Sequence, residues 1–238
     1  MKIALIGYGK MGQAIEGIAL QRGHQIVLKI GIENLEDFTP ANLQMADVAI
    51  EFTGPESAVA NLMACFDAGV PVVCGSTGWL QHKSNVEEYC TQKSGAFLYA
   101  SNFSLGVNLF FELNKYLAKL MAPHPSYDVQ LTEIHHTAKL DAPSGTAITL
   151  AEQVLAQIPG KTHWVNEPTT QQDALFIESQ RIDPAPGTHT ILYTSPVDDI
   201  SITHTAHSRQ GFALGAVVAA EFLAGKKGIY SMQQVLQL

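Results

Sequence analysis

Residues 2–21 read KIALIGYGKMGQAIEGIALQ, and three patterns follow one another in this stretch. Residues 2–6 form a short apolar run, which is typical of a buried parallel strand. Glycines at positions 7, 9 and 12 follow at once, and residues 13–21 carry apolar side chains at helical spacing. Such glycines allow a tight turn, the approach of a pyrophosphate and close packing of helix on strand. The stretch therefore predicts a dinucleotide-binding unit, with a purely structural turn as the alternative.

The second strand is predicted at residues 25–30, and its end bears on the choice of cofactor. A dinucleotide fold usually places an acid there, bonded to the adenosine ribose. The corresponding residue is Gly31, and Glu33, two positions later, could substitute for the acid. Loss of the acid would weaken discrimination against the 2′-phosphate of NADP. Lys10 and Lys29 are candidate phosphate partners, although Lys29 could equally be a solvated strand residue, so the choice between NADH and NADPH stays open.

Strand-like and helical runs continue to alternate up to about residue 101. Strands are expected at residues 47–52, 70–74 and 96–100, and helices at residues 56–68 and 80–94. This order is typical of an α/β fold with a doubly wound parallel sheet, here of the Rossmann type. Gly75-Ser76-Thr77-Gly78 follows one of these strands, and small hydroxyl residues at that edge suit contact with a ligand. A plain polar turn is the alternative for this segment.

The second half of the chain has a different pattern. Strand-like runs dominate from about residue 127 to 206, interrupted by one amphipathic helix and by residues 161–170, which we expect to form a loop. This predicts a second, inserted α+β domain built on a mostly open sheet. We expect residues 1–103 and 210–238 to form the dinucleotide-binding domain and residues 104–209 the substrate-binding and oligomerisation domain. The active site is then expected in the cleft between the two domains.

Residues 133–147 read EIHHTAKLDAPSGTA and join a predicted strand to that helix. His135 and Lys139 can each donate a proton near neutral pH if their pKa values are tuned. Ser144, Gly145 and Thr146 lie at the predicted helix N-terminus, where unpaired N–H groups attract anions. The pattern indicates a small substrate that carries carboxylate or phosphate. The alternatives are an ordinary N-cap, a solvated loop, or two metal ligands; no Cys or carboxylate spacing completes a metal site.

Composition limits the classes of partner. The chain has 238 residues, 46% hydrophobic content and a formal net charge of −8, which argues against nucleic acid or an anionic membrane as the main partner. The N-terminal apolar run is too short for a signal peptide or a membrane span. The cysteines at 65, 74 and 90 have no CxxC spacing and are expected to be reduced and buried. We therefore expect a cytoplasmic globular protein.

Residues 133–147 also match a family signature at every fixed position. The segment resembles the pattern Glu-x-His-His-x-x-Lys-x-Asp-Ala-Pro-Ser-Gly-Thr-Ala of the 4-hydroxy-tetrahydrodipicolinate reductases, formerly called dihydrodipicolinate reductases. Residues 101–108 resemble the family's Ala-Asn-Phe-Ser-x-Gly-Val-Asn, and residues 75–78 resemble its Gly-Thr-Thr-Gly. Arg181, Gly187 and His189 resemble an Arg…Gly-x-His hairpin. The resemblance spans nearly the whole chain and is weakest at about residues 31–45 and 160–175.

The resemblance implies an enzyme of lysine and diaminopimelate biosynthesis. Its reaction would be the NADH- or NADPH-dependent reduction of 4-hydroxy-tetrahydrodipicolinate to tetrahydrodipicolinate, with loss of water. His135 would donate the proton, with Lys139 as partner donor and electrostatic stabiliser. His136 and the amides of Ser144, Gly145 and Thr146 would hold the two carboxylates. No metal is implied.

The resemblance and the glycine loop together imply a set of cofactor-binding residues at the sheet edge. They are Gly7, Tyr8, Gly9, Lys10, Met11, Gly12, Glu33, Gly75, Ser76, Thr77, Ala100, Ser101, Asn102 and Phe103. The family is usually tetrameric through the sheet of the second domain, so a homotetramer is expected. Two rival functions are a nicotinamide-sensing regulatory protein and another two-domain amino-acid dehydrogenase. A sensor would bind cofactor without turnover, and a dehydrogenase would oxidise an amino acid.

Overall fold

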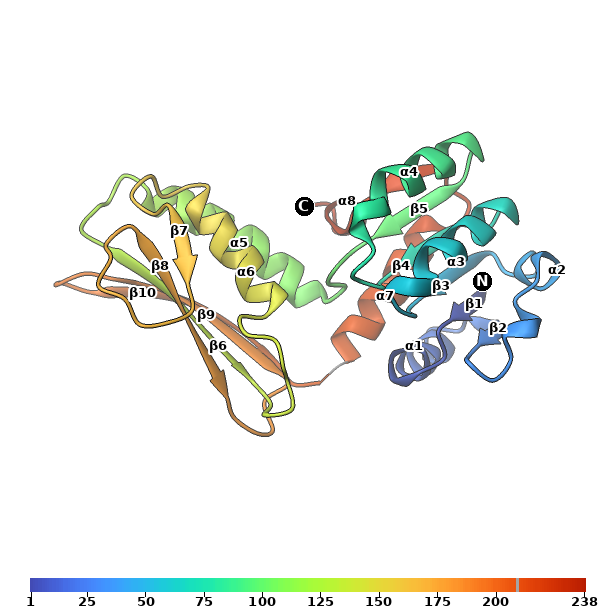
Figure 1. The fold of residues 1–238 in the computed structure, drawn as a ribbon, viewed down its shortest axis with the longest axis horizontal. Coiled ribbons are helices and arrows are strands. Elements are labelled where there is room, and N and C mark those ends of the chain that lie inside the picture. The colour runs from blue at the N-terminus through green and yellow to red at the C-terminus, as the bar shows by residue number, and fades with distance from the viewer. Residues whose placement is uncertain (209) are drawn as a thin grey trace. The chain divides into compact units, whose positions relative to one another are not determined.

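The computed structural model describes residues 1–208 and 210–238 and divides the chain into two compact units (Figure 1). Unit 1 comprises Met1–Leu105 and Gln210–Leu238, and unit 2 the described residues of Gly106–Arg209. The division falls after residue 105, two residues beyond the boundary expected from the sequence. None of the described helices is long and apolar enough to cross a membrane.

Unit 1 is built on a six-stranded sheet in which every neighbouring pair of strands is parallel. The strand order is β11-β5-β4-β3-β1-β2. The strands are β1 (Lys2–Ile6), β2 (Gln25–Ile30), β3 (Val48–Glu51), β4 (Val72–Cys74), β5 (Ala96–Tyr99) and β11 (Gly228–Tyr230). The helices are α1 (Lys10–Gln21), α2 (Pro40–Leu43), α3 (Pro55–Asp67), α4 (Lys83–Gln92), α7 (Gln210–Leu223) and α8 (Met232–Leu236), with short 3-10 turns at Leu35–Asp37 and Leu80–His82.

Both faces of this sheet are buried, as the apolar strands require. Ile3 and Leu5 of β1 pack in a core with residues of α1 and α7. Ala4 and Ile6 point to the other face and pack in a core with residues of α3 and α4. Because alternate residues of one strand enter two separate cores, the sheet is doubly wound, and the predicted Rossmann-type fold class is confirmed.

Unit 2 is built on a five-stranded mixed sheet in the order β10-β9-β6-β8-β7. The strands are β6 (Asp128–His135), β7 (His163–Val165), β8 (Ala174–Arg181), β9 (Gly187–Thr194) and β10 (Asp199–Ala206). β6 is antiparallel to β9 and parallel to β8. The helices α5 (Leu105–Met121) and α6 (Gly145–Leu155) lie on one face of the sheet (Figure 1). Leu131, Ile177 and Ile191 of the sheet pack there against Leu150 and Val154 of α6.

Two short strands differ from expectation. β7 lies inside residues 161–170, which were wrongly predicted to be a loop, and it pairs in parallel with β8. β11 was not predicted and pairs in parallel with β5 at the edge of the first sheet. Each has three residues, which is too few to show a period-2 pattern in the sequence.

The three cysteines are free and buried, as predicted. Burial raises the pKa of each thiol, to about 11 for Cys90. The thiols are therefore protonated and unreactive at neutral pH.

Candidate functional site

The glycine loop between β1 and α1 has the geometry that a dinucleotide needs. Gly7 has a φ of +97°, and an added Cβ would lie 2.0 Å from the carbonyl oxygen of Phe52. At Gly12 an added Cβ would lie 2.5 Å from the Gly7 oxygen. Gly9 is the N-cap of α1 without a side-chain cap, and an added Cβ there would meet no described atom within 4 Å. The N-terminus of α1 is thus open to an anion such as a pyrophosphate.

A cavity of about 600 Å³ begins at this loop. Its walls combine the glycine loop with apolar residues that follow β2 and small polar residues that follow β3. The lining is Ile6, Gly7, Tyr8, Gly9, Ile30, Gly31, Ile32, Leu35, Phe38, Thr53, Gly54, Glu56, Ser57 and Asn61. The apolar part suits an adenine ring, and the residues present therefore fit a dinucleotide. Leu35 and Phe38 were not singled out from the sequence, because their place in this wall depends on tertiary packing.

The end of β2 is organised by an asparagine and not by an acid. The Gly31 N–H donates to Oδ1 of Asn34 at 2.8 Å, and Nδ2 of Asn34 donates to the Lys29 carbonyl at 2.9 Å. Glu33 is exposed beside this turn and lines a neighbouring cavity with Lys29 and Gly31. The end of β2 therefore has no carboxylate at position 31 itself.

Lys29 is held by neighbours of its own unit. Its Nζ lies 3.3 Å from Oε1 of Glu16 and 4.9 Å from the centre of the Tyr8 ring. The Tyr8 hydroxyl also donates to Glu16. These contacts, first of all the hydrogen bond from Tyr8, lower the pKa of Glu16, so the carboxylate offsets the lysine charge. Lys10, the other candidate phosphate partner, is exposed in the first turn of α1.

The loops after β4 and β5 lie at the same sheet edge, because Cys74 and Tyr99 are in register with Glu51 of β3. Ser76 is buried; its hydroxyl donates to Glu51 at 3.0 Å and accepts from the Thr53 N–H at 2.8 Å. The Ser76 hydroxyl thus faces inward instead of lying free for a ligand, whereas the next residue in the loop is exposed.

Phe52 fills the space between these loops. An added Cβ at Gly75 would lie 2.2 Å from the Phe52 ring, so this glycine is required by packing. Phe103 is buried with its ring centre 5.6 Å from that of Phe52, and Ala100 is also buried. Thr77 and Ser101 are exposed at the same edge, and Oδ1 of Asn102 accepts from the Ser104 N–H at 2.9 Å. Thr77 and Ser101 are therefore the accessible members of the predicted set in these loops.

In unit 2, β6 ends at His135 and α6 begins at Gly145, with Ser144 as its N-cap. Oγ of Ser144 accepts from the Ala147 N–H at 3.2 Å, so the N-cap alternative is confirmed for this residue. The same oxygen lies 3.2 Å from Nε2 of His189. Gly145 is exposed, with no described atom within 4 Å of an added Cβ, and Thr146 is half-buried. The exposed N-terminus of α6 can therefore receive an anion closely.

Glu133 is a fully buried carboxylate at the centre of this site. Both its oxygens lie 3.1 Å from the Ser144 N–H nitrogen, and one accepts from the Ser179 hydroxyl at 2.8 Å and lies 3.3 Å from Nη2 of Arg181. Burial alone would raise its pKa, but the hydrogen bonds from His189, Ser144 and Ser179 hold that pKa well below its usual range. Glu133 is therefore ionised at every pH at which an enzyme works.

His135 is buried beside this carboxylate. Its Nδ1 lies 3.4 Å from Oε2 of Glu133, and its ring centre is 5.1 Å from that of His189. Burial lowers the pKa of His135 to about 4; the Glu133 charge raises it, and His189, Lys139 and Arg181 lower it further. The imidazole is therefore neutral at pH 7 in the free protein.

Lys139 and His136 lie in the turn that follows β6. Nζ of Lys139 is 2.7 and 2.8 Å from the two carboxylate oxygens of Asp141, and the side chain is largely shielded. Its backbone N–H donates to the His136 carbonyl at 3.1 Å, and His136 is half-buried. Nη2 of Arg181 donates to the Asp141 carbonyl at 2.6 Å and ties this turn to β8.

Glu133, His135 and His189 bring candidate metal-ligand atoms within 4.8 Å of one another. The carboxylate, however, already accepts from an N–H and a hydroxyl group, and the Arg181 guanidinium beside it would repel a divalent cation. We interpret the cluster as a hydrogen-bonded network that sets the charge around His135.

Glu133, Arg181 and His189 received no role from the sequence alone, although they stand in the motifs quoted above. Glu133 pairs with Ser179 on one side and with His189 on the other, across three strands. His135 pairs with Arg181. These cross-strand contacts depend on the register of the strands, which the sequence motifs do not specify.

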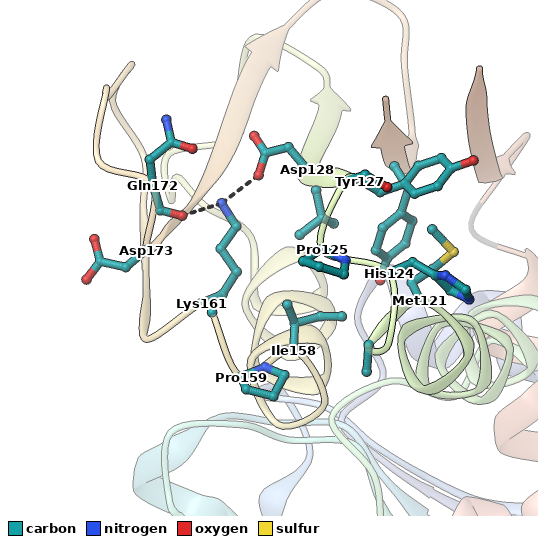
Figure 2. Close-up of a pocket in the computed structure, with 15 residues that line it drawn as sticks. Met121, His124, Pro125, Tyr127, Asp128, Ile158, Pro159, Lys161, Gln172 and Asp173 are labelled. Atoms are coloured by element: carbon teal, nitrogen blue, oxygen red, sulfur yellow. Dashed lines mark hydrogen bonds and ion pairs between the residues drawn. The ribbon is translucent and has the colours of Figure 1, made fainter. Parts of the chain in front are cut away.

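A second cavity of about 600 Å³ in unit 2 lies at the opposite end of β6 from His135 (Figure 2). Figure 2 shows Lys161 bonded to Asp128 and to Gln172. Its Nζ lies 2.7 Å from Oδ1 of Asp128 and donates to the Gln172 carbonyl at 2.9 Å. The strand between them has eight residues, about 23 Å from the first to the last. This cavity therefore does not belong to the site around His135.

Comparison with known proteins shows the family to which the chain belongs. Residues 1–103 match the family model described as dihydrodipicolinate reductase, N-terminus, and residues 106–236 match dihydrodipicolinate reductase, C-terminus. The chain is 52% identical to a 4-hydroxy-tetrahydrodipicolinate reductase of Christiangramia forsetii, over 99% of this chain and 98% of that protein. It is 34% identical to one of Ralstonia nicotianae over the full length of both.

A solved structure shares the fold across both units. Dipicolinate-bound dihydrodipicolinate reductase from Paenisporosarcina sp. TG-14 superimposes with a TM-score of 0.78 and 23% identity over 98% of each chain. Since both family models match and together cover nearly the whole chain, the chain belongs to the dihydrodipicolinate reductase family of oxidoreductases.

Proposed function

We propose that this protein reduces 4-hydroxy-tetrahydrodipicolinate to tetrahydrodipicolinate with loss of water, using NADH or NADPH, in lysine and diaminopimelate biosynthesis. The observation that carries the proposal is the arrangement of His135, Glu133 and the N-terminus of α6. A buried imidazole lies there beside a permanent carboxylate and an anion-binding helix end. Two relatives that carry this activity in their names are 52% and 34% identical to the chain over nearly its whole length.

Unit 1 is proposed to bind the dinucleotide, and a bound nicotinamide supplies a hydride for transfer to a ring carbon. The open N-terminus of α1 and the glycines before it would hold the pyrophosphate. The cavity between Gly31 and Thr53 would take the adenosine. Because no acid occupies position 31 itself, we propose that both NADH and NADPH are used. Thr77 and Ser101 would approach the nicotinamide end.

Unit 2 is proposed to bind the substrate, a small dicarboxylate. A related structure with dipicolinate bound supports that class of ligand. The backbone N–H groups at Gly145 and Thr146 would bind one carboxylate at the α6 N-terminus. His136 and Lys139 lie in the segment between β6 and α6, and their side chains would bind the second carboxylate. Ser144 would contribute by capping α6, since its hydroxyl accepts from the Ala147 N–H and its own N–H already donates to Glu133.

His135 is proposed to hold and deliver the proton. Two substrate carboxylates arriving beside the imidazole would raise its pKa from the low value of the free protein. Glu133 would then stabilise the imidazolium through Nδ1, which leaves Nε2 as the donating atom. Gly187 lies beside Nε2, where an added Cβ would come within 3.1 Å, so this glycine keeps the donating side uncrowded. Lys139 would stabilise the negative charge that develops in the ring.

Assembly and location complete the proposal. The outer face of the sheet in unit 2 carries partly exposed residues, among them Thr188, Thr190 and Leu192 on β9. We propose that this face joins four copies into a homotetramer. Three buried reduced thiols support a cytoplasmic location.

A coupled assay tests the function. The substrate is generated in place from pyruvate and aspartate semialdehyde by the preceding synthase, and the loss of NADH or NADPH absorbance is followed. The proposal expects turnover that depends on the synthase and on this protein. Cofactor binding without turnover would favour a nicotinamide sensor, and oxidation of an amino acid would favour a dehydrogenase.

A further inference from the structure

Glu51 is a second fully buried carboxylate, and the reaction proposed above gives it no role. It is the last residue of β3, at the edge of the sheet where the loops after β3 and β4 emerge. Its Cα is in register with Cys74, the last residue of β4. A buried acid is costly unless its oxygens are satisfied, so its partners indicate what it does.

Both loops donate to this one side chain. Oε1 of Glu51 accepts from the Thr53 N–H at 3.1 Å, from the Thr53 hydroxyl, and from the Ser76 hydroxyl at 3.0 Å. Nδ2 of Asn61 on α3 reaches the same oxygen at 3.5 Å. Oε2 accepts from Sγ of Cys74 at 3.1 Å. In the described part of the chain these partners are all uncharged, so the carboxylate serves to gather hydrogen-bond donors and not to neutralise a cation.

The gathered groups border the dinucleotide cavity. Thr53 and Asn61 line it, and Ser76 precedes the exposed Thr77 in the other loop. The Thr53 N–H also donates to Oγ of Ser76 at 2.8 Å, which closes a ring of bonds between the two loops. The Ser76 carbonyl accepts from the Trp79 indole at 2.7 Å and anchors the far side of that loop.

We propose that Glu51 is a positioning residue for the dinucleotide. Its carboxylate fixes the Thr53 and Ser76 loops relative to each other, so that their backbones meet the bound nucleotide without reorganisation. An uncharged replacement weakens these charge-assisted bonds and lets the loops separate. The inference rests on the proposed function, because it assumes that this edge binds NADH or NADPH.

The test compares two Glu51 variants with two matched controls. E51Q keeps the shape and weakens the acceptor, and E51M removes both acceptors at similar volume. D67N makes the same charge change at the exposed end of α3, and I50V destabilises the neighbouring position of β3, whose side chain enters the opposite core. The dissociation constants of NADH and NADPH are measured by fluorescence, together with Tm and the KM for substrate.

We expect the dissociation constant to rise about fivefold in E51Q and about twentyfold or more in E51M, from loss of charge-assisted hydrogen bonds. D67N and I50V bind the nucleotide as the wild type does, although I50V has a lower Tm. The KM for substrate stays within about twofold in E51Q. If E51M does not fold, E51Q alone decides.

Unchanged nucleotide binding in E51Q with a lowered Tm would overturn the inference and leave the proposed function standing. A parallel rise in the KM for substrate would also overturn it, because that indicates a general disturbance. A wild-type protein that binds neither NADH nor NADPH would overturn the proposed function, and the inference with it.

Discussion

Nδ1 of His135 lies 3.4 Å from Oε2 of Glu133, and both side chains are buried at the end of β6. The pair joins a carboxylate that is always ionised to an imidazole that is neutral at pH 7 in the free protein. A partner of this kind stabilises a histidine only once the histidine is protonated. We propose that the site takes up a proton when negative charge arrives with the substrate.

The depressed pKa of His135 predicts how stability depends on pH. The pKa is about 4 in the folded protein and 6.5 in the unfolded chain, so between these values the unfolded state binds more protons. The neutral, buried His135 therefore contributes to the free energy of unfolding above pH 6.5. This contribution is lost as the pH falls towards 4, and the loss reaches about 3 kcal/mol. Urea unfolding at pH 7 and pH 5 should show a smaller loss of stability in H135Q than in the wild type. His204, whose pKa is also lowered, remains in both proteins and cancels in the comparison. Equal losses would contradict the assignment.

Replacing Glu133 with glutamine should destabilise unit 2 and impair turnover. The amide cannot offset the charge of the half-buried Arg181, and it presents an NH₂ group to the Ser144 N–H, which now donates to both carboxylate oxygens. We expect a loss of about 3 kcal/mol in the free energy of unfolding, from removing the buried carboxylate of this partly shielded charge pair. E178Q, an exposed acid on β8, is the control and should cost less than about 0.5 kcal/mol. A stable, fully active E133Q would disprove the central role of this carboxylate.

Lys139→Met should raise the KM for substrate and lower kcat together. The ammonium group is proposed both to bind a substrate carboxylate and to stabilise the negative charge that develops in the ring during the reaction. We expect at least about a tenfold loss in each, with unchanged affinity for NADPH. K115M serves as the control, since Lys115 is a half-exposed lysine paired with Glu112 on α5. Steady-state kinetics of the two variants decide the matter. An unaffected K139M enzyme would rule the lysine out.

Gly31→Asp should shift the choice of cofactor. An added Cβ at Gly31 has no atom closer than 3.8 Å among the described residues, so the side chain fits. The new carboxylate would bond a ribose hydroxyl of NADH and repel the 2′-phosphate of NADPH. We expect the ratio of kcat/KM for NADH to that for NADPH to rise at least about tenfold. G31N, which adds a side chain of the same size without charge, is the control. A ratio unchanged in G31D would mean that the adenosine ribose lies elsewhere.

Local pattern was enough to predict the first unit and the central segment. The glycine loop and the 133–147 segment can each be recognised from consecutive residues, and the strands around them are long or strongly apolar. Three-residue strands such as β7 and β11 carry too little pattern, and their existence depends on a neighbouring strand.

The register of the strands and the direction of individual side chains could not be predicted from the sequence. His189 meets Glu133 because β9 lies antiparallel to β6, and nothing in the 55 residues between them specifies that alignment locally. The inward direction of the Ser76 hydroxyl likewise depends on Glu51, a residue 25 positions earlier. Residue types thus pointed to the site, and tertiary packing assigned each side chain its partner.

The most direct measurement is the steady-state turnover of H135Q beside the wild type in the coupled assay, with the dissociation constant of NADPH measured in parallel. The account predicts that kcat falls about 10²–10⁴-fold, the usual contribution of a positioned proton donor, while NADPH binds as before. An H135Q enzyme that keeps its turnover, or one that loses cofactor binding to the same degree, would contradict the account.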